Sequence, residues 1–321
     1  MTHSHSDSNV SRAVRRYSVL TCLVALLPIG IGSVVTTLKA GMAFADWPTS
    51  DGQNMLLYPW LNDLRHTDKF VEHGHRLAGM LIGFVSIGLV AVAFWKEKLR
   101  WVRLYAVAIL IAVIGQGLLG GMRVRMNAQV LAMVHSITGG LFFTLCFSFV
   151  ILNYRRPSRS LEDDTKTPVW GVGAALLLPL AVLGQYVLGG FFRHLGSMLY
   201  EHLAGAAGVF LLASVVIFLG RRSQISAIRR RSTWLAVALV TQISLGLGAW
   251  VTKMGLPSTG RVVVANSPAQ NIICSLHTIG GMFLLATATA FAVETVACLK
   301  HGRFHALSDA FTPVNSQEGM A

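Results

Sequence analysis

The chain has 321 residues, of which 53% are hydrophobic and only 13% are charged. A soluble protein of this length could not cover so much apolar surface with so few charged residues. The net charge of +13 comes from 27 basic and 14 acidic residues, and the basic ones lie in short clusters between long apolar runs. This pattern indicates an integral membrane protein surrounded by lipid rather than a nucleic-acid-binding protein.

Apolar runs long enough to cross a bilayer follow one another along the chain. The first is too long for the core of a signal peptide and has no clear cleavage site after it, so we predict that it is retained. We therefore predict an all-α integral membrane protein with eight transmembrane helices. The eight runs cover residues 17–38, 73–95, 104–122, 131–153, 168–192, 199–219, 233–253 and 271–298.

The connections between these runs alternate in their content of basic residues. Of the 27 Lys and Arg residues, 18 lie in the N-terminal tail, the segments 96–103, 154–166 and 220–232, and the C-terminal tail. The alternate loops and outer span ends carry the other nine. The positive-inside rule then places both termini in the cytoplasm. The longest connection, 39–72, lies outside and is expected to fold at the membrane surface.

Short sequence patterns recur in the two halves of the chain. His75-Arg-Leu-Ala-Gly resembles His202-Leu-Ala-Gly, and His135-Ser-Ile-Thr-Gly-Gly resembles His277-Thr-Ile-Gly-Gly. A Gln-x-x-x-Gly pattern recurs in spans three, five and seven, beginning at Gln116, Gln185 and Gln242.

This repeat predicts two parallel-repeat four-helix bundles. The N-terminal half covers 17–153 and the C-terminal half 168–298. A cytoplasmic linker, 154–167, joins them, and the cytoplasmic tails are 1–16 and 299–321.

Four histidines lie within about the first two turns of the even-numbered spans: His75, His135, His202 and His277. They therefore share one depth near the outer face. An ionisable residue in a span is costly and usually faces the protein interior with a partner. An interhelical hydrogen bond would explain one such histidine, but four at one depth indicate the axial ligands of haem. Copper or zinc would prefer further Cys, Asp or Glu ligands.

Two sets of nearby residues fit a large, flat, anionic ligand. Glycines three to five residues after each histidine lie on its face, one turn deeper, where they would let a porphyrin edge approach. For any single glycine, ordinary helix packing in a membrane is the simpler explanation. These glycines are Gly79, Gly139, Gly140, Gly205, Gly280 and Gly281. The candidate partners for haem propionates are Arg76, Arg123, Arg125 and Arg193.

Acidic residues distinguish the two halves. Glu72 precedes His75 by three residues, so both point from one helical face. Glu201 is adjacent to His202 and points about 100° away. A carboxylate beside only one histidine pair indicates that the two sites do different work, although Glu72 could also be a hydrated interfacial residue or a partner of Arg76.

The cysteines offer neither a disulfide framework nor a CxxC zinc pattern. They lie inside or at the edges of apolar runs, at Cys22, Cys146, Cys274 and Cys298. We therefore expect no regulatory disulfide.

These features together resemble the haem A synthase family. The resemblance rests on Glu72-x-x-His75-Arg76, on Asp46-Trp47-Pro48, on the His-Ser/Thr-Ile context of two histidines and on eight spans in two halves, and it covers about residues 17–298. It implies a multi-pass inner-membrane oxidoreductase. This enzyme would convert the C8 methyl of haem O to the formyl of haem A, with water as the oxygen source, and the haem A would serve cytochrome oxidase.

The family resemblance also assigns roles to residues. His75 and His135 would bind the iron of the substrate haem O, His202 and His277 the iron of a haem b cofactor, and Glu72 would be the catalytic carboxylate. Haem O synthase and oxidase assembly factors are the implied partners. Many bacterial members carry a cysteine pair in the first outer loop, whereas 39–72 contains none. A di-haem electron-transfer protein resembling cytochrome b and a haem transporter or chaperone remain alternatives.

Overall fold

A computed structural model describes residues 10–155, 169–256 and 263–310 of the chain, and within these ranges every regular element is helical. Each of the eight α-helices contains a stretch that is long and apolar enough to cross a membrane. The predicted all-α membrane protein with eight spans is confirmed. The helices are α1 (Arg12–Thr37), α2 (Thr67–Lys96), α3 (Arg100–Arg125), α4 (Gln129–Tyr154), α5 (Val169–Leu195), α6 (Leu199–Arg222), α7 (Ser226–Met254) and α8 (Pro268–Ala310).

The helices are longer than the apolar runs that predicted them. Helix α2 begins at Thr67, so Glu72 lies inside a helix, and α8 continues to Ala310, beyond the predicted end at 298. Hydropathy marks only the roughly 20 residues that cross the apolar core of a bilayer, whereas helical hydrogen bonding continues into polar ends. Most of the predicted linker, 156–167, lies outside the described residues.

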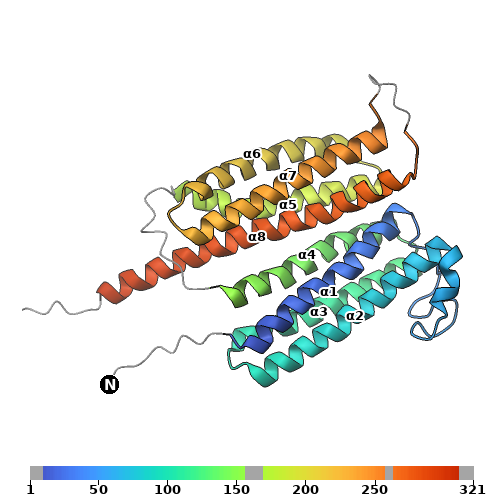
Figure 1. Ribbon diagram of the computed structural model, residues 1–321, viewed down its shortest axis with the longest axis horizontal. Coiled ribbons are helices and arrows are strands. Elements are labelled where there is room, and N and C mark those ends of the chain that lie inside the picture. The colour runs from blue at the N-terminus through green and yellow to red at the C-terminus, as the bar shows by residue number, and fades with distance from the viewer. Residues whose placement is uncertain (1–9, 156–168, 257–262, 311–321) are drawn as a thin grey trace, which may run out of the picture.

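The helices form two groups that lie side by side (Figure 1). In the first helix group, α1–α4, each helix contacts its neighbours in chain order and α4 closes the ring against α1. In the second helix group, α5–α8, α8 closes the ring against α5 in the same way. The groups meet where α8 contacts α1 and α4, and where α4 contacts α5. That the groups are copies of one repeat stays a prediction.

Helix α8 is the central element of the assembly. In its most apolar window 61% of the residues are buried, against 11–33% in the other seven helices. Met282 and Ala286 enter the core of the first group, while Leu284 and Leu285 enter the core of the second. The other helices turn large apolar side chains outward, where lipid can cover them; examples are Phe84, Ile111, Leu180 and Leu247.

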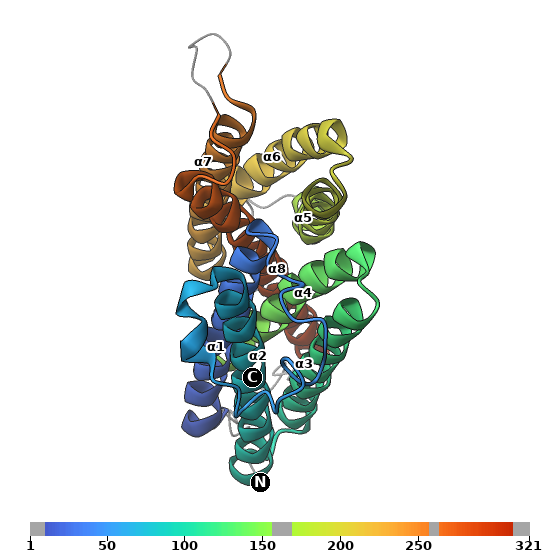
Figure 2. The same cartoon turned by 90° about the vertical axis from the view of Figure 1, so that its right-hand side faces the viewer.

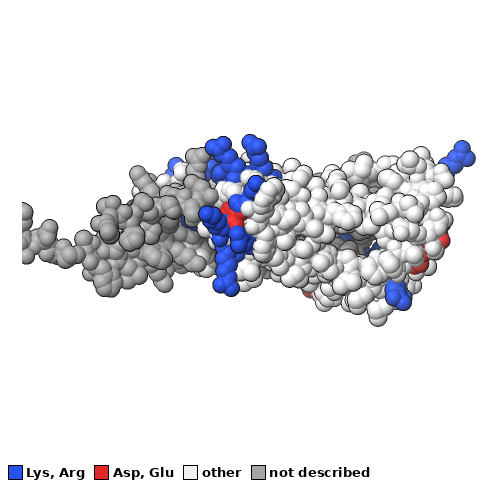
Figure 3. Space-filling view, turned by 90° about the horizontal axis from the view of Figure 1, so that it is seen from below, with Lys and Arg blue, Asp and Glu red and all other residues white. Residues whose placement is uncertain are grey.

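Charge is distributed unevenly along the molecule. Figure 3 shows many Lys and Arg side chains in one band, a broad mostly uncharged surface beside it and a few further charged side chains at the far end. The short connection from α2 to α3 alone carries Lys96, Lys98, Arg100 and Arg103 across its ends. A basic band next to an apolar belt is typical of a membrane protein, and which side of the membrane the termini occupy stays a prediction.

The connection between α1 and α2 is a folded loop, residues 38–66, which includes the 3-10 helix η1 (Trp60–Arg65). In the end-on view of Figure 2 this loop passes over the end of the first helix group. At that end the described residues of the second group include only the short connection from α5 to α6 and parts of the one from α7 to α8. The loop therefore makes the surroundings of the two histidine pairs unequal.

Candidate functional site

The four histidines form two facing pairs, each from diagonally opposite helices of one group. The ring centroids of His75 on α2 and His135 on α4 are 6.1 Å apart, with an interplanar angle of 86°. Those of His202 on α6 and His277 on α8 are 6.4 Å apart, also at 86°. The structure thus brings together the pairs expected from the sequence, although their role as ligands stays a prediction.

The spacing within each pair fits one metal ion held between two imidazoles. An imidazole nitrogen binds a metal at about 2 Å, and the ring centre lies about 1 Å behind it, so two axial rings have centres about 6 Å apart. No group of three or more His, Cys, Asp or Glu side chains that could hold a bare ion occurs among the described residues. Two-histidine sites are therefore suited to a metal whose other ligands come from a macrocycle.

Each histidine ring lies against a glycine of the preceding odd-numbered helix. A Cβ added at the glycine would stand 2.8–3.1 Å from the ring carbon Cε1. Any larger residue there would displace the ring. The glycines therefore help to set the distance between the two facing imidazoles of each pair. The contacts are Gly32 with His75, Gly120 with His135, Gly189 with His202 and Gly246 with His277.

Hydrogen bonds at Nδ1 orient the rings further. Nδ1 of His75 lies 2.9 Å from the backbone carbonyl oxygen of Pro28, and because a carbonyl can only accept, Nδ1 carries the proton. The lone pair is then on Nε2, which is the nitrogen a metal would bind. At His202 the side-chain amide of Gln185 lies beside Nδ1, with its nitrogen 2.9 Å from Nδ1 and 2.8 Å from the His202 carbonyl oxygen. With that nitrogen as donor, Nδ1 accepts; the same amide turned over would place its unpartnered Oε1 against Nδ1 and give the tautomer seen at His75.

Four of the six glycines that follow the histidines lie against other side chains in the structure. Beside Gly205 and Gly280 the space is occupied by the amides of Gln185 and Gln242, and beside Gly140 and Gly281 by the ring of Tyr186. These glycines make room for side chains of the odd-numbered helices; Gly79 alone of the predicted set has no atom within 4 Å of its added Cβ.

The sequence did contain a signal for the glycines that matter. In each Gln-x-x-x-Gly repeat the glutamine reaches toward the next helix, and the glycine one turn later receives the histidine ring. The repeat predicted no role for its glycines, so Gly120, Gly189 and Gly246 were not expected as site residues.

A cavity of about 370 Å³ opens beside the second histidine pair. This volume lies in the range of sites for small-molecule ligands and cofactors. Its lining is mostly apolar and includes His202, His277, Tyr186 and Phe192; the charged residues in it are the cations Arg193 and Lys253, with no Asp or Glu. An apolar cavity with two cations and two facing imidazoles fits a flat iron porphyrin with two carboxylates.

Lys253 was not singled out by sequence reasoning because it is one of several basic residues at outer span ends. Its ammonium group lies 4.7 Å from the centre of the Phe192 ring. Phe192 in turn stacks on the His202 ring, with centroids 6.5 Å apart and planes at 16°. This stack connects the mouth of the cavity to one of its histidines.

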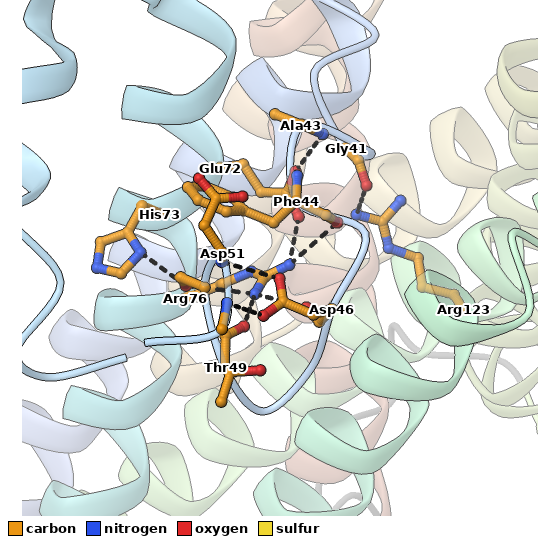
Figure 4. A network of polar contacts seen from close by, with 12 residues as sticks. Gly41, Ala43, Phe44, Asp46, Thr49, Asp51, Glu72, His73, Arg76 and Arg123 are labelled. Atoms are coloured by element: carbon orange, nitrogen blue, oxygen red, sulfur yellow. Dashed lines mark hydrogen bonds and ion pairs between the residues drawn. The ribbon is translucent and has the colours of Figure 1, made fainter. Parts of the chain in front are cut away.

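The first histidine pair is distinguished by a buried carboxylate. Glu72 is 1% exposed, and its Oε2 accepts hydrogen bonds from the backbone nitrogens of Ala43 at 2.7 Å and Phe44 at 3.2 Å (Figure 4). Its Oε1 pairs with Arg76 at 2.9 Å. Glu201, the acidic residue near the second pair, is exposed. The expected difference between the two halves is thus present, and Glu72 is partnered rather than hydrated.

The arginines of the first group hold the outer loop. Arg76 donates to the backbone carbonyl oxygens of Asp46 at 2.9 Å and Thr49 at 2.8 Å (Figure 4). Arg123 donates to that of Gly41 at 2.8 Å. Between these anchors Trp47 packs against Gly121 of α3. The Asp-Trp-Pro element is therefore the part of the loop that lies over the first site.

The arginines proposed as propionate partners differ in their surroundings. The described partners of Arg76 and Arg123 are loop carbonyls and Glu72, whereas Arg125 is exposed and Arg193 lines the cavity. Cys22, Cys146 and Cys274 are free thiols, and the absence of a regulatory disulfide stays a prediction.

Comparison with known protein families shows to which family the chain with these sites belongs. The sequence model of the COX15-CtaA family, described as cytochrome oxidase assembly protein, matches residues 15–202. That segment runs from α1 into α6 and covers more than half of the chain. The chain belongs to this family. The matched segment of the cytochrome oxidase assembly family contains Glu72, the outer loop and three of the four paired histidines.

Individual relatives give shorter matches. The chain is 27% identical to the heme A synthase of Brucella ovis over 99 residues, which are 29% of this chain and 27% of the relative. It is 29% identical to the heme A synthase of Mesorhizobium japonicum over 96 residues, which are 28% of this chain and 24% of the relative. The matched segment spans about a quarter of the length of these relatives.

Proposed function

We propose that this protein is a haem A synthase that oxidises the C8 methyl group of haem O to a formyl group. With water as the oxygen source, the change from methyl to formyl consumes one water and releases four protons and four electrons. The substrate haem O would bind through His75 and His135. The proposal is supported by family membership and by the name heme A synthase of the relatives.

One structural observation supports this proposal in addition to family membership. The two histidine pairs have nearly the same geometry, yet among the described residues a buried carboxylate and a covering loop accompany only the first pair. Two equal haems that only relay electrons would have no use for this difference. A site that transforms its ligand needs a polar group near the reacting carbon and protection from bulk water.

Residues of the first site would divide the work as follows. His75 and His135 hold the substrate iron and thereby fix the porphyrin plane. Glu72 lies one turn outside His75 on the same helix face and is the acidic residue nearest to His75 in the sequence. Its carboxylate would stabilise positive charge or orient the attacking water. Arg76 holds the Glu72 carboxylate in place through their contact at 2.9 Å, and the loop that Arg76 anchors limits the entry of solvent.

The second site would hold haem b as a cofactor, with His202 and His277 binding its iron. When bound, this haem supplies a one-electron acceptor for the electrons released at the first site. Arg193 and Lys253 stand at the cavity as candidate partners of its two propionates, and the absence of Asp and Glu from the lining favours that arrangement. Among the other arginines, exposed Arg125 is the one best placed to meet a propionate of the substrate.

The proposal includes a cellular setting. The protein would lie in the cytoplasmic (inner) membrane with both termini in the cytoplasm, receive its substrate from haem O synthase and deliver haem A to cytochrome oxidase assembly factors. The eight apolar helices and the family support a multi-pass membrane location.

The test is the haem composition of purified protein and of the cells that express it. Wild type should contain one tightly held haem b and an exchangeable second haem, and cells should accumulate haem A. His202→Leu and His277→Leu should lose the tightly held haem b, whereas His75→Leu and His135→Leu should keep it and lose haem A.

Other compositions would favour the alternatives. Two equivalent low-spin haems and no haem A would favour a di-haem electron-transfer protein, and two exchangeable haems would favour a transporter or chaperone. Retention of an unchanged low-spin spectrum in His202→Leu would refute the assignment of the cofactor site.

A further inference from the structure

The guanidinium of Arg193, near the end of α5, is hydrogen-bonded to both helix groups. Its Nη2 donates to the Ser33 carbonyl oxygen at 2.7 Å and to Thr37 Oγ1 at 2.8 Å, both on α1. Its Nη1 donates to the Cys274 carbonyl oxygen at 3.2 Å and to Thr278 Oγ1, both on α8. One side chain therefore joins helices of the first and second groups.

The partners of Arg193 are immediate neighbours of both histidine sites. Thr278 follows His277 in the chain, and Ser33 follows Gly32, against which the His75 ring lies. Ser275 completes the cluster: its carbonyl oxygen accepts from Ser33 at 3.1 Å, and its hydroxyl lies 2.9 Å from that of Thr37. A set of polar contacts through the guanidinium thus joins residues adjacent to one site with residues adjacent to the other.

The charge of Arg193 is not neutralised by an acidic residue. None of the four ion pairs among the described residues includes it, and its Nε is buried without a hydrogen-bond partner. Its described partners are carbonyl and hydroxyl oxygens, which leave a net positive charge. In an apolar environment such a charge acts on its surroundings more strongly than it would in water, and Arg193 lies on the wall of the cavity that contains His277.

This position has a consequence for any iron porphyrin in the cavity. Reduction of ferric iron adds one negative charge to the site. A fixed positive charge nearby stabilises the reduced form and so raises the reduction potential. Arg193 is well suited to this effect because its hydrogen bonds to α1 and α8 hold the guanidinium in one place between the sites.

We propose that Arg193 is a positioning residue that raises the reduction potential of the haem held by His202 and His277 and thereby makes it a better acceptor for electrons released at the first site. This inference rests on the proposed function, because it assumes a haem at the second pair. It gives Arg193 an electrostatic role in addition to any contact with a propionate.

The experiment is a redox titration of haem absorbance in the purified, full-length, haem-containing protein. Two neutral variants, Arg193→Gln and Arg193→Met, remove the charge, and Arg193→Lys keeps it without the planar fork. We expect the equilibrium constant for reduction to fall about tenfold or more in the neutral variants, a change of about 59 mV toward negative potential, with a retained low-spin spectrum. Arg193→Lys should stay close to wild type.

Arg65→Gln is the control, because Arg65 is an exposed cation of the outer loop and its charge is screened by water. It should leave the potential unchanged. An unchanged potential in haem-containing Arg193→Gln would overturn the inference, and so would equal shifts in the neutral and Lys variants. Loss of the haem from both neutral variants would assign Arg193 to haem retention and would overturn it as well.

The same preparation separates this inference from the proposed function. Wild-type protein that binds no haem would overturn both. A wild type that binds haem b and forms haem A, with no dependence of the potential on the charge at position 193, would overturn the role of Arg193 alone.

Discussion

The imidazole ring of His202 on α6 lies against Gly189 on α5, at a distance that leaves no room for a side chain. A Cβ at Gly189 would stand 3.1 Å from Cε1 of the ring. The same relationship holds for the other three paired histidines, each with a glycine of the preceding helix. The distance between facing rings is therefore set by helix packing as well as by the histidines themselves.

Replacing this glycine should weaken haem binding at the second site. In Gly189→Ala the added methyl group pushes the His202 ring by a few tenths of an ångström, and we expect the affinity for haem b to fall by about tenfold or more. The measurement is the haem content of purified protein during titration with a competing haem-binding protein.

Gly184→Ala provides a matched control on the same helix, because an added Cβ there meets no atom within 4 Å. It should retain full haem content. Equal haem affinity of Gly189→Ala and Gly184→Ala would show that the glycine contact does not position the ring.

Replacing Glu72 should stop the reaction without preventing substrate binding. Glu72→Gln keeps the shape of the side chain and removes the charge, so conversion should stop at haem O or at the hydroxylated intermediate. Breaking a buried ion pair by removing one partner lowers the free energy of unfolding by about 3–5 kcal/mol. Because glutamine can still accept one of the loop hydrogen bonds, the loss of stability in Glu72→Gln should be smaller than that. The readout is the pigment composition of cells carrying wild type, Glu72→Gln or Glu201→Gln.

A second substitution separates chemistry from loop anchoring. Arg76→Met removes the contacts to Asp46 and Thr49 but leaves the Glu72 carboxylate. Both variants should make the outer loop more sensitive to protease, while Glu72→Gln should show the greater loss of haem A. Undiminished haem A in Glu72→Gln would refute a catalytic role.

The outer loop should become less stable in acid through Asp46. Burial by itself raises the pKa of this carboxyl, but hydrogen bonds from Thr49 and from the backbone of Gly52 and Asp51 outweigh it and hold the pKa below its usual range. A carboxylate with a lowered pKa in the folded loop stabilises it above the ordinary value of about 3.9, and this contribution disappears as the pH falls through the folded-state pKa.

Hydrogen exchange of loop peptides measures this effect. Asp46→Asn should exchange faster than wild type at pH 7, and the difference should vanish at low pH, where the wild-type carboxyl is protonated. A difference of the same size at both pH values would mean that the charge of Asp46 does not stabilise the loop.

Both termini should lie in the cytoplasm. The split of 18 basic residues against nine predicts this orientation. A reporter fused after residue 300 should therefore be active in its cytoplasmic form, and one inserted near residue 56 of the outer loop in its exported form. The opposite pattern would invert the predicted topology.

The sequence alone was sufficient for the eight spans and for singling out the four histidines. Hydropathy and helical spacing are local properties, so a run such as 131–153 and the place of His135 within it can be recognised without knowing what lies beside them. The pairing of His75 with His135 was implied by the resemblance to the haem A synthase family.

Tertiary structure decided the surroundings of those histidines. The contact of Gly189 with His202, the capture of the Glu72 carboxylate by the backbone of Ala43 and the bridge from Arg193 to Ser33 all depend on which helix faces lie together. Side-chain spacing within one helix does not contain that information, because the same pattern can face lipid, a loop or another helix. Only the packing of α1, α5 and α8 placed a single guanidinium between two sites that are far apart in the chain.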